Sequence, residues 1–311
     1  MKKIEKVSLI GLGAMGVFFA PRLYQTFGEN FRVIAEGARK ERLETKGVTI
    51  NGTNYHFPII TPKEQGNTAD LIIIAVKAYS LEQAICDIKN QVGANTQILC
   101  VLNGVDSEER LIQEFGEEHV LYSYMRMSIV MKDGVADFDP YWGKVFFGEK
   151  KNQTYTERVE KIKEVFECSD IPYEIEEDML KGIWFKYMCN IGENMTCAML
   201  GIPFGAFRKS EDANYIRKNA MREVAAIAQK KGIDIGEGEI ELQEKTVMSI
   251  PFPNKPSTLQ DLEGKKQTEI ELFAGTVVRM GKELSIPTPI NEIFYHAIRV
   301  LEEKNEGLCV E

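Results

Sequence analysis

The stretch KVSLIGLGAMG, residues 6–16, decides the fold of this 311-residue chain. Residues 6–10 alternate too little for an amphipathic strand and suit a central parallel strand that is buried on both faces. Three glycines follow at the spacing G-x-G-x-x-G: the first allows a tight turn, the second lets a pyrophosphate approach the backbone, and the third lets a helix pack against the strand. The motif alone is weak, but here it lies between a strand and an amphipathic segment that reaches about Phe27, so it predicts dinucleotide binding at the helix N-terminus. The predicted cofactor contacts in this loop are Gly11, Gly13, Ala14, Met15 and Gly16.

The next strand along the chain bears on the choice of cofactor. It covers residues 31–35 and ends at Glu36, 20 residues past Gly16. An acidic side chain at this position accepts hydrogen bonds from the adenosine ribose and repels a 2′-phosphate, which favours NAD. Arg39, Lys40 and Arg42 follow closely and can bind that phosphate if the loop turns them inward, or else they form the solvated start of a helix. The sequence therefore leaves NAD and NADP open, with Glu36 and Arg39 as the residues that decide.

Two further strands end in polar residues. A buried strand, residues 70–76, is followed by Lys77, and a strand at residues 97–102 is followed by Asn103. In an open α/β sheet the carboxyl ends of the strands line the ligand crevice. Lys77 alone is readily explained as a surface lysine, but two polar strand ends on one rim favour a role in binding cofactor or substrate.

Alternating β and α signals continue to a break at residues 169–172, and helical periods follow it. Before the break we expect a hairpin at 48–60 around Asn51-Gly52, helices at 80–92, 106–115 and 154–167, an extended run at 119–131, a polar excursion at 132–143 and a strand at 144–148. After it we expect helices at 178–200, 211–231, 236–248, 267–284 and 291–304. The predicted fold is an α/β, Rossmann-type doubly wound parallel sheet, residues 1–170, followed by an all-helical second domain, residues 171–311.

The segment IWFKYMCNIGENM, residues 183–195, carries the second candidate site. Lys186, Asn190 and Asn194 stand four apart, so in an α-helix each side chain turns only about 40° from the last and all three share one face. The residues between them are mostly apolar, so the helix should be substantially buried and its polar stripe should need partners. The alternative is a lysine on a solvated helix edge with two incidental asparagines.

Composition excludes several classes of function. The 47 acidic and 38 basic residues give a net charge of −9 without a strongly basic segment, which argues against nucleic-acid and anionic-membrane partners. Six cysteines at wide spacings, Cys309 among them, indicate reduced thiols and a cytoplasmic protein, and three scattered histidines argue against a metal site. Residues 1–20 superficially resemble a signal peptide, but the three glycines favour the dinucleotide loop, and no later segment reaches transmembrane length.

In order along the chain, these motifs resemble the ketopantoate reductase (2-dehydropantoate 2-reductase) family over nearly the whole length. The set comprises the glycine loop, Lys77, Asn103-Gly104, the Lys186-x-x-x-Asn190-x-x-x-Asn194 stripe, Ser257-Thr-Leu-Gln-Asp261 and Thr268-Glu269-Ile270. The resemblance implies a Rossmann-type domain joined to a helical domain with the active site between them. By the same resemblance Lys186 is the catalytic lysine, Glu269 the active-site glutamate and Lys77 the lysine near nicotinamide and substrate. It also implies that the substrate contacts are Asn103, Asn190, Asn194 and Ser257.

Two features depart from the family's pattern. Family members commonly carry an arginine for the NADP phosphate where this chain has Glu36. Residues 125–142 also depart from the small-residue, glycine-rich segment expected there. Related members reduce other branched 2-oxo acids to D-2-hydroxy acids, some with NAD, so the departures bear on both cofactor and substrate.

The chemistry of Lys186 also follows from first principles. Reduction of a 2-oxo acid leaves a carbonyl oxygen that gains negative charge and must receive a proton, and a lysine ammonium does both jobs. Burial lowers a lysine pKa from its ordinary value of about 10.4, whereas an ionised Glu269 opposes that shift. Ser257 suits a substrate carboxylate through its hydroxyl and a helix N-terminus, or is simply an N-cap.

We therefore predict an oxidoreductase that uses NAD(P)H to reduce a 2-oxo acid, most closely 2-dehydropantoate to pantoate, with Lys186 as general acid. The alternatives are an NAD-dependent D-2-hydroxyacid dehydrogenase of the same family and a dinucleotide-binding sensor without turnover. A 3-hydroxyacyl or 6-phosphogluconate type of dehydrogenase is a further alternative; the first is disfavoured by the lack of a suitable histidine. The sequence leaves open whether the chain forms a homodimer.

Overall fold

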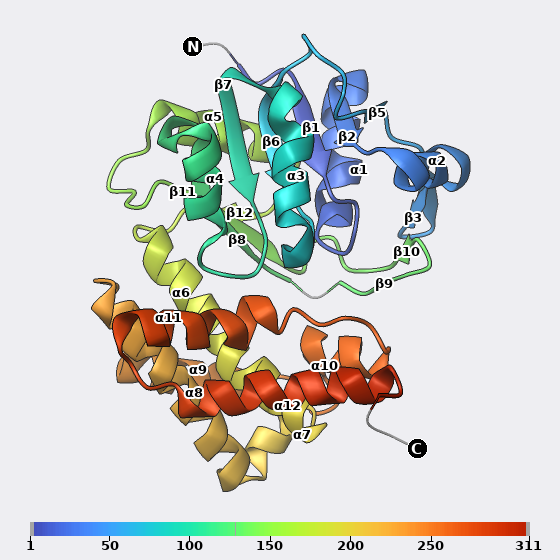
Figure 1. Ribbon diagram of the computed structural model, residues 1–311. Coiled ribbons are helices and arrows are strands. Elements are labelled where there is room, and N and C mark those ends of the chain that lie inside the picture. The colour runs from blue at the N-terminus through green and yellow to red at the C-terminus, as the bar shows by residue number, and fades with distance from the viewer. Residues whose placement is uncertain (1–2, 128, 309–311) are drawn as a thin grey trace. The chain divides into compact units, whose positions relative to one another are not determined.

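A computed structural model describes residues 3–127 and 129–308, so Cys309 lies outside the described residues. The chain divides into two compact units, Met1–Leu180 and Lys181–Glu311 (Figure 1). Strand β12 (Tyr173–Glu174) pairs with the sheet of the first unit, beyond the boundary at residue 170 that the sequence suggested. The division into a cofactor domain and a substrate domain stays a prediction.

The first unit is built on an eight-stranded sheet, in the order β5-β2-β1-β6-β7-β8-β11-β12. The six strands from β5 to β8 are parallel, β11 is antiparallel to β8, and β12 is parallel to β11. Their bounds are β1 Val7–Ile10, β2 Phe31–Ile34, β5 Ile59–Ile60, β6 Ala69–Ile74, β7 Val92–Cys100, β8 Val120–Arg126 and β11 Lys144–Gly148. The expected Rossmann-type order is confirmed, with an antiparallel strand added at one edge.

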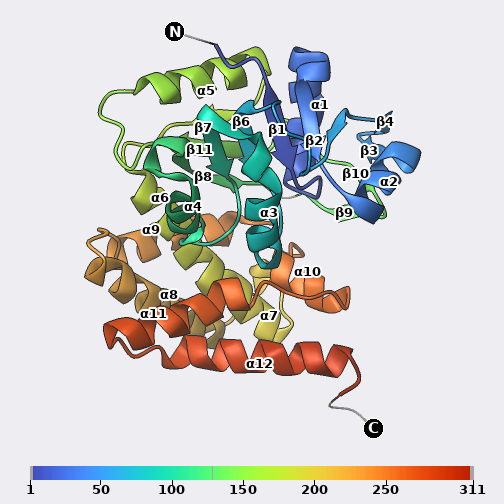
Figure 2. The same cartoon turned by 45° about the horizontal axis from the view of Figure 1, so that its top comes forward.

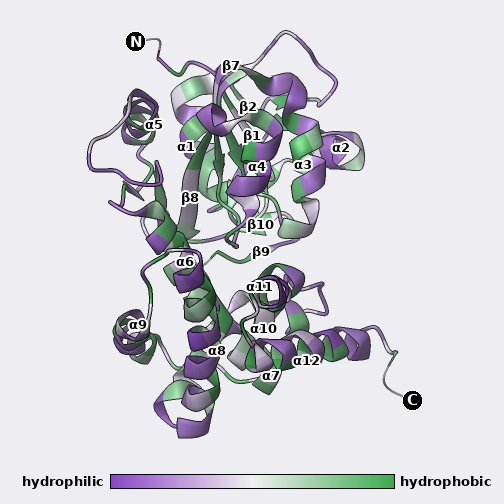
Figure 3. Cartoon of the chain, turned by 60° about the vertical axis from the view of Figure 1, so that its left-hand side comes forward, coloured by the Kyte–Doolittle hydropathy of each residue, from purple (hydrophilic) through white to green (hydrophobic). Residues whose placement is uncertain are grey.

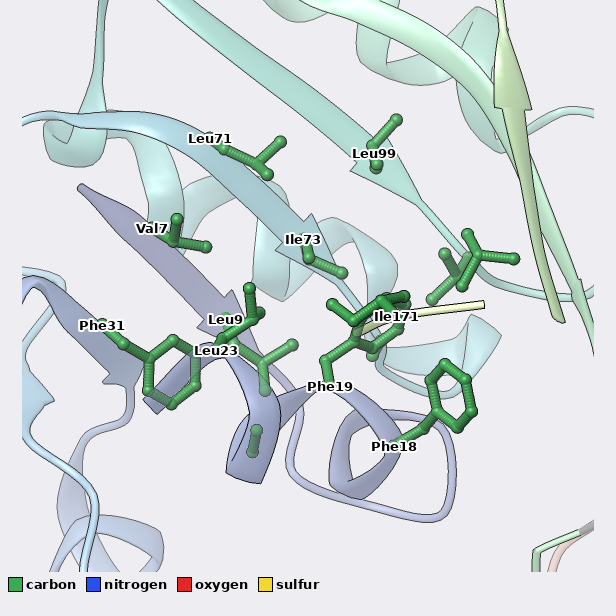
Figure 4. Packing of buried hydrophobic residues seen from close by; sticks show 14 of the residues in the cluster. Val7, Leu9, Phe18, Phe19, Leu23, Phe31, Leu71, Ile73, Leu99 and Ile171 are labelled. Carbon is green, nitrogen blue, oxygen red and sulfur yellow. The ribbon is translucent and has the colours of Figure 1, made fainter. Parts of the chain in front are cut away.

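Helices cover both faces of this sheet (Figures 1 and 2). Successive side chains of a strand point to opposite faces, so Leu9 and Ile10 enter different cores. The core around Leu9 includes Phe18, Phe19 and Phe166 and is closed by α1 (Gly16–Phe27) and α5 (Glu157–Cys168), as Figure 4 shows in part. The core around Ile10 is closed by α3 (Leu81–Ile88) and α4 (Ser107–Phe115). The unit is therefore doubly wound, as the sequence predicted.

The excursion at residues 132–143 is not a plain loop. The predicted hairpin forms as β3 (Val48–Ile50) and β4 (Thr53–Tyr55), with Asn51 and Gly52 at positive φ as a two-residue turn requires. A second hairpin consists of β9 (Met131–Lys132) and β10 (Val135–Ala136), and β10 pairs with β3 to make a four-stranded sheet. The predicted extended run at 119–131 therefore ends at Arg126, and part of the divergent segment 125–142 builds this small sheet.

The second unit is helical. Its α-helices are α6 Met179–Cys189, α7 Thr196–Leu200, α8 Glu211–Lys230, α9 Glu237–Ser249, α10 Ser257–Glu263, α11 Thr276–Leu284 and α12 Pro289–Asn305. Figure 3 shows hydrophobic central strands in the first unit, and helices with mixed hydrophilic and hydrophobic residues in both units. Across residues 3–127 and 129–308, none of the helices combines the length and the apolar character needed to cross a membrane.

Two of the predicted helices are interrupted by π-helix. The expected helix 178–200 contains the π-helical segment Asn190–Met195 between α6 and α7, named here the first π turn. The expected helix 267–284 starts later, with the π-helical segment Glu271–Gly275, the second π turn, directly before α11. The two π turns contact each other. A π turn carries one extra residue per hydrogen-bonded ring, a requirement that apolar periodicity does not reveal.

Candidate functional site

The parallel register brings the predicted residues of the first unit to one edge of the sheet. Ile10 is paired with Ile74, and Ile74 with Cys100. Gly13, Lys77 and Asn103 each lie three residues beyond one of these paired positions. Since the strands are parallel, all three residues follow carboxyl ends at the same edge, where open α/β sheets bind ligands.

The three glycines of the loop differ in what their missing side chain accommodates. A Cβ on Gly11, whose φ is +94°, would lie 2.4 Å from the Ala75 carbonyl oxygen, and a Cβ on Gly16 would lie 2.0 Å from the Gly11 carbonyl oxygen. Gly13 is exposed, and a Cβ there would meet no described protein atom within 4 Å. Gly11 and Gly16 are thus required by the protein's own packing, whereas the space beside Gly13 fits the close approach of a pyrophosphate.

The N-terminus of α1 fits a phosphate as well. Ala14 and Met15 lead into the helix, and Met15 at the N-cap position makes no side-chain capping hydrogen bond. No acidic residue lies in the first turn. The helix dipole therefore presents its positive end without a competing carboxylate of its own, which suits a dinucleotide.

Glu36 lies at the N-cap position of α2 (Gly37–Lys46), directly after β2. Its exposed carboxylate forms an ion pair with Lys63, whose ammonium pKa is raised chiefly by that hydrogen bond. Arg39 is exposed in the first turn of α2. Lys63 could not be found from the sequence, because it belongs to a loop without a motif and contacts Glu36 only in the folded chain.

A buried carboxylate that the sequence analysis missed lies five residues after Asn103. Glu108, in the first turn of α4, is 3% exposed; it accepts hydrogen bonds from the Ser107 hydroxyl at 2.9 Å and, at 3.4 Å, from the Ser123 backbone N–H. Burial raises the pKa of Glu108 to about 7. A signal existed: with Leu111, Ile112 and Phe115, Glu108 falls at the i, i+3, i+4, i+7 positions of the helix's apolar face.

In the second unit, α6 carries Lys186 on its last turn, half-buried. The first π turn starts four residues later, and the Asn194 side-chain nitrogen lies 3.5 Å from the Asn190 side-chain oxygen. Asn190 is half-buried and Asn194 is 9% exposed. The two amides are therefore neighbours, although they lie on a π-helical rather than an α-helical segment.

Glu269 is not a helix residue, contrary to the expected helix 267–284. It precedes the second π turn, is 8% exposed, and its carbonyl oxygen accepts a hydrogen bond from the Phe273 N–H. The hydroxyl of Tyr187, the residue after Lys186, donates to the carbonyl oxygens of Leu272 and Phe273 at 3.1 and 2.6 Å. This link ties the Lys186 helix to the segment that follows Glu269, so these two predicted residues lie on joined segments.

Ser257 is the first residue of α10 and is exposed. The N-cap position belongs to Pro256, so the alternative interpretation of Ser257 as an N-cap is wrong. Proline suits that position because its ring restricts φ to about −65°, close to the −69° found at Pro256. Helix α10 contacts the first π turn and α7. The first π turn thus contacts both α10, which begins at Ser257, and the second π turn, which follows Glu269, so the predicted residues of this unit lie on linked segments.

The described residues give little sign of other chemistry. Among residues 3–127 and 129–308, no group of three or more His, Cys, Asp or Glu side chains is placed to hold a metal ion. The five described cysteines have free thiols, two of them exposed and three buried.

Comparison with known proteins agrees with this geometry. The family described as Ketopantoate reductase PanE/ApbA matches residues 7–152, and its C-terminal counterpart matches residues 178–302. The 2-dehydropantoate 2-reductase of Streptococcus pyogenes serotype M3 is 26% identical over 287 residues, which cover 91% of this chain and 93% of that protein.

Solved structures share the fold at lower identity. A D-mandelate dehydrogenase with NADH and anilino(oxo)acetate matches with a TM-score of 0.86 at 22% identity, over 97% of this chain and 99% of that one. A dimeric ketopantoate reductase from Staphylococcus aureus matches with a TM-score of 0.79 at 20% identity, over 96% of this chain and 99% of that one.

The fold and the glycine loop define a Rossmann-type dinucleotide-binding unit, and the family match makes the chain an oxidoreductase that binds a nicotinamide dinucleotide. Within that class, the matches over residues 7–152 and 178–302 are decisive. The chain belongs to the ketopantoate reductase family.

Proposed function

We propose that this protein reduces a 2-oxo acid to a D-2-hydroxy acid with NAD(P)H, and that its substrate is 2-dehydropantoate, giving pantoate. The observation that carries the proposal is the arrangement in the second unit. There Lys186 precedes a π turn that holds two adjacent amides, and Tyr187 ties its helix to the Glu269 segment. One cation, two amide donors and a buried carboxylate suit a substrate with a carbonyl and a carboxylate.

In this proposal each side chain has one task. The bound nicotinamide supplies the hydride to the carbonyl carbon. The Lys186 ammonium hydrogen-bonds the carbonyl oxygen, stabilises its growing negative charge and gives it a proton. Glu269 holds the ammonium charged and oriented, the amides of Asn190 and Asn194 bind the substrate's polar groups, and the Ser257 hydroxyl donates to the carboxylate.

The first unit holds the cofactor in the same proposal. The Gly11–Gly16 loop and the N-terminus of α1 bind the pyrophosphate, Glu36 binds the adenosine ribose, and Lys77 and Asn103 face the nicotinamide side. We propose that NADH is used at least as well as NADPH, because the Glu36 carboxylate repels a 2′-phosphate. The pair with Lys63 is exposed and therefore weak, so Glu36 can exchange it for the ribose hydroxyl.

The test is a matrix of both reduced cofactors against ketopantoate, bulkier branched 2-oxo acids and aromatic 2-oxo acids, followed by nicotinamide absorbance. We expect the highest kcat/KM for ketopantoate with NADH. Preference for an aromatic acid would favour the alternative, a D-2-hydroxyacid dehydrogenase. Aromatic acids are included because the chain shares its fold with a D-mandelate dehydrogenase. No turnover with any pair would leave the sensor interpretation.

Lys186→Ala tests the chemistry directly. Loss of the proton donor and of the charge should lower kcat roughly 10² to 10⁴-fold, while the Kd for NADH stays unchanged. Lys186→Arg should rescue little, because a guanidinium keeps the charge but is a poor acid. The matched control is Lys181→Ala on the same helix, where Lys181 pairs with Glu239 at 2.8 Å. Near-parent kcat in a well-folded Lys186→Ala variant would contradict the mechanism.

We further propose a homodimer in the cytoplasm. The dimeric relative from Staphylococcus aureus and the free thiols support these two points. Light scattering on the purified protein measures the first, and a mass near 35 kDa rather than twice that value would contradict it.

A further inference from the structure

A charged cluster is buried behind the first π turn. Arg217, on α8, is fully inaccessible, and Glu193, within the π turn, is 5% exposed. The Arg217 Nη1 lies 3.6 Å from the Glu193 Oε1, and the Gln243 side-chain N–H, from α9, donates to the same oxygen at 2.8 Å. A cation, an anion and an amide from three helical segments therefore meet in the interior of the second unit.

Arg217 has few other polar partners among the described residues. Its Nε donates to the Asn214 side chain at 3.1 Å, and its guanidinium lies over the Phe207 ring, 5.3 Å from the centroid. Neither terminal nitrogen has a hydrogen-bond partner among the described residues. Burial lowers the pKa of Arg217, and the Glu193 charge counteracts that effect. Such a pair is costly to form, so stability alone explains it poorly.

The residue before Glu193 locks the same turn to α8. A Cβ on Gly192 would lie 2.5 Å from the Met221 Cγ and 2.9 Å from the Arg217 carbonyl oxygen. Gly192 and Glu193 thus face α8 and α9, while Asn190 and Asn194 flank them on either side in sequence. A π turn has poorer intrinsic geometry than an α-helix and persists where tertiary contacts hold it.

We propose that Arg217, Glu193 and Gln243 are positioning residues that hold the first π turn, and through it set the amides of Asn190 and Asn194 for the substrate. This proposal rests on the substrate-binding role proposed above for the two asparagines. The cluster fixes the turn from the interior, so the two amides start in their binding geometry rather than having to find it. Its effect should appear in the KM for the 2-oxo acid more than in the Kd for the dinucleotide.

The test separates positioning from stability. Arg217→Met leaves Glu193 buried without its cation and should lower Tm and raise KM. The double variant Glu193→Leu/Arg217→Met removes both charges, which should restore most of the Tm because buried apolar pairs replace buried ion pairs well. We expect its KM to stay about tenfold above the parent's, with the Kd for NADH unchanged. A double variant that regains both Tm and KM would overturn the proposal.

Two further variants keep the test decisive. Glu193→Gln keeps the shape of the side chain and removes the charge; even if the double variant does not fold, a raised KM here supports the proposal and an unchanged KM overturns it. The matched control is Arg222→Met/Glu237→Leu, which removes an exposed ion pair of 2.6 Å between the same two helices, α8 and α9. Its KM should equal the parent's.

Activity of the parent protein is measured first, so the two proposals fail separately. If the parent reduces no 2-oxo acid, the proposed function has failed. The cluster is then tested by hydrogen exchange of residues 190–195. Faster exchange in Glu193→Gln than in the Arg222→Met/Glu237→Leu control supports the positioning role, and equal exchange overturns it.

Discussion

Glu108 in the first unit and Glu193 in the second are nearly inaccessible carboxylates close to the candidate sites, and the chain surrounds the two differently. Glu108, at the start of α4 in the first unit, has a hydroxyl and a backbone N–H as hydrogen-bond donors. Glu193, in the first π turn of the second unit, has the Arg217 guanidinium and the Gln243 amide. The first is 3% exposed and the second 5%, so burial alone does not distinguish them.

The difference lies in what happens to the charge. Neutral donors offset only part of the desolvation cost, so Glu108 has a pKa of about 7 and takes up a proton near neutral pH. Glu193 instead lies 3.6 Å from the Arg217 Nη1, and a cation at that distance favours the charged form of a carboxylate. The edge of the sheet is thus supported by a buried carboxyl group with neutral hydrogen-bond donors, and the π turn by a buried ion pair.

The largest expected effect that tests this contrast is on stability against pH. The folded-state pKa of Glu108 lies above its ordinary value of 4.5, so its contribution to stability is fully present below pH 4.5 and is lost as the pH rises through about 7. Glu108→Gln mimics the protonated form at every pH. Its free energy of unfolding should match the parent's near pH 4 and exceed it by about 3 kcal/mol at pH 8, measured by urea unfolding.

The neighbouring glutamate provides the control for this measurement. Glu109 lies on the same helix and is exposed, so Glu109→Gln should change the free energy of unfolding by no more than about 0.5 kcal/mol at either pH. Parallel curves for the parent and Glu108→Gln would contradict the contrast. They would mean that burial does not raise the pKa of Glu108.

The second expected effect concerns the packing that holds Glu193 in place. Gly192→Ala introduces a Cβ against Met221 and the backbone of Arg217, and should lower the free energy of unfolding by about 1–3 kcal/mol. Gly238→Ala in α9 is the matched control, because a Cβ there meets no described atom within 4 Å and alanine favours a helix. Thermal and urea unfolding of both variants check the sign. An unaffected Gly192→Ala protein would show that the turn is not locked to α8.

The features that could be predicted from the sequence lie mainly in the first unit. The edge of the sheet could be predicted because its requirements are local: the glycine spacing, the apolar strands and the polar residue after each strand lie within short stretches. The positions of Gly13, Lys77 and Asn103 beyond paired strand residues agree with that prediction. The glycine loop and the doubly wound sheet needed no knowledge of distant partners.

The first π turn could not be predicted, because its causes lie on other helices. Gly192 faces α8, and Glu193 meets Arg217 and Gln243, residues 24 and 50 positions further on by sequence number. The four-residue spacing of Lys186, Asn190 and Asn194 predicted an α-helix, and the amides nevertheless remain neighbours. The hairpin β9–β10 was missed for a similar reason, since its second strand, β10, pairs with β3, far away in the chain.

The smallest expected effect tests whether Gly13 is needed for cofactor binding, whereas Gly16 and Gly192 are needed for packing. Gly16 and Gly192 lack space for a Cβ because protein atoms occupy it, whereas the space beside Gly13 holds no described protein atom. If a pyrophosphate uses that space, Gly13→Ala should raise the Kd for NADH about tenfold, or roughly 1.4 kcal/mol, and leave unfolding unchanged. Gly16→Ala should instead destabilise the fold, since its Cβ would lie 2.0 Å from the Gly11 carbonyl oxygen. Fluorescence titration with NADH measures the binding. Parent-like affinity in Gly13→Ala would mean that the cofactor approaches the loop elsewhere, and that the open space has another cause.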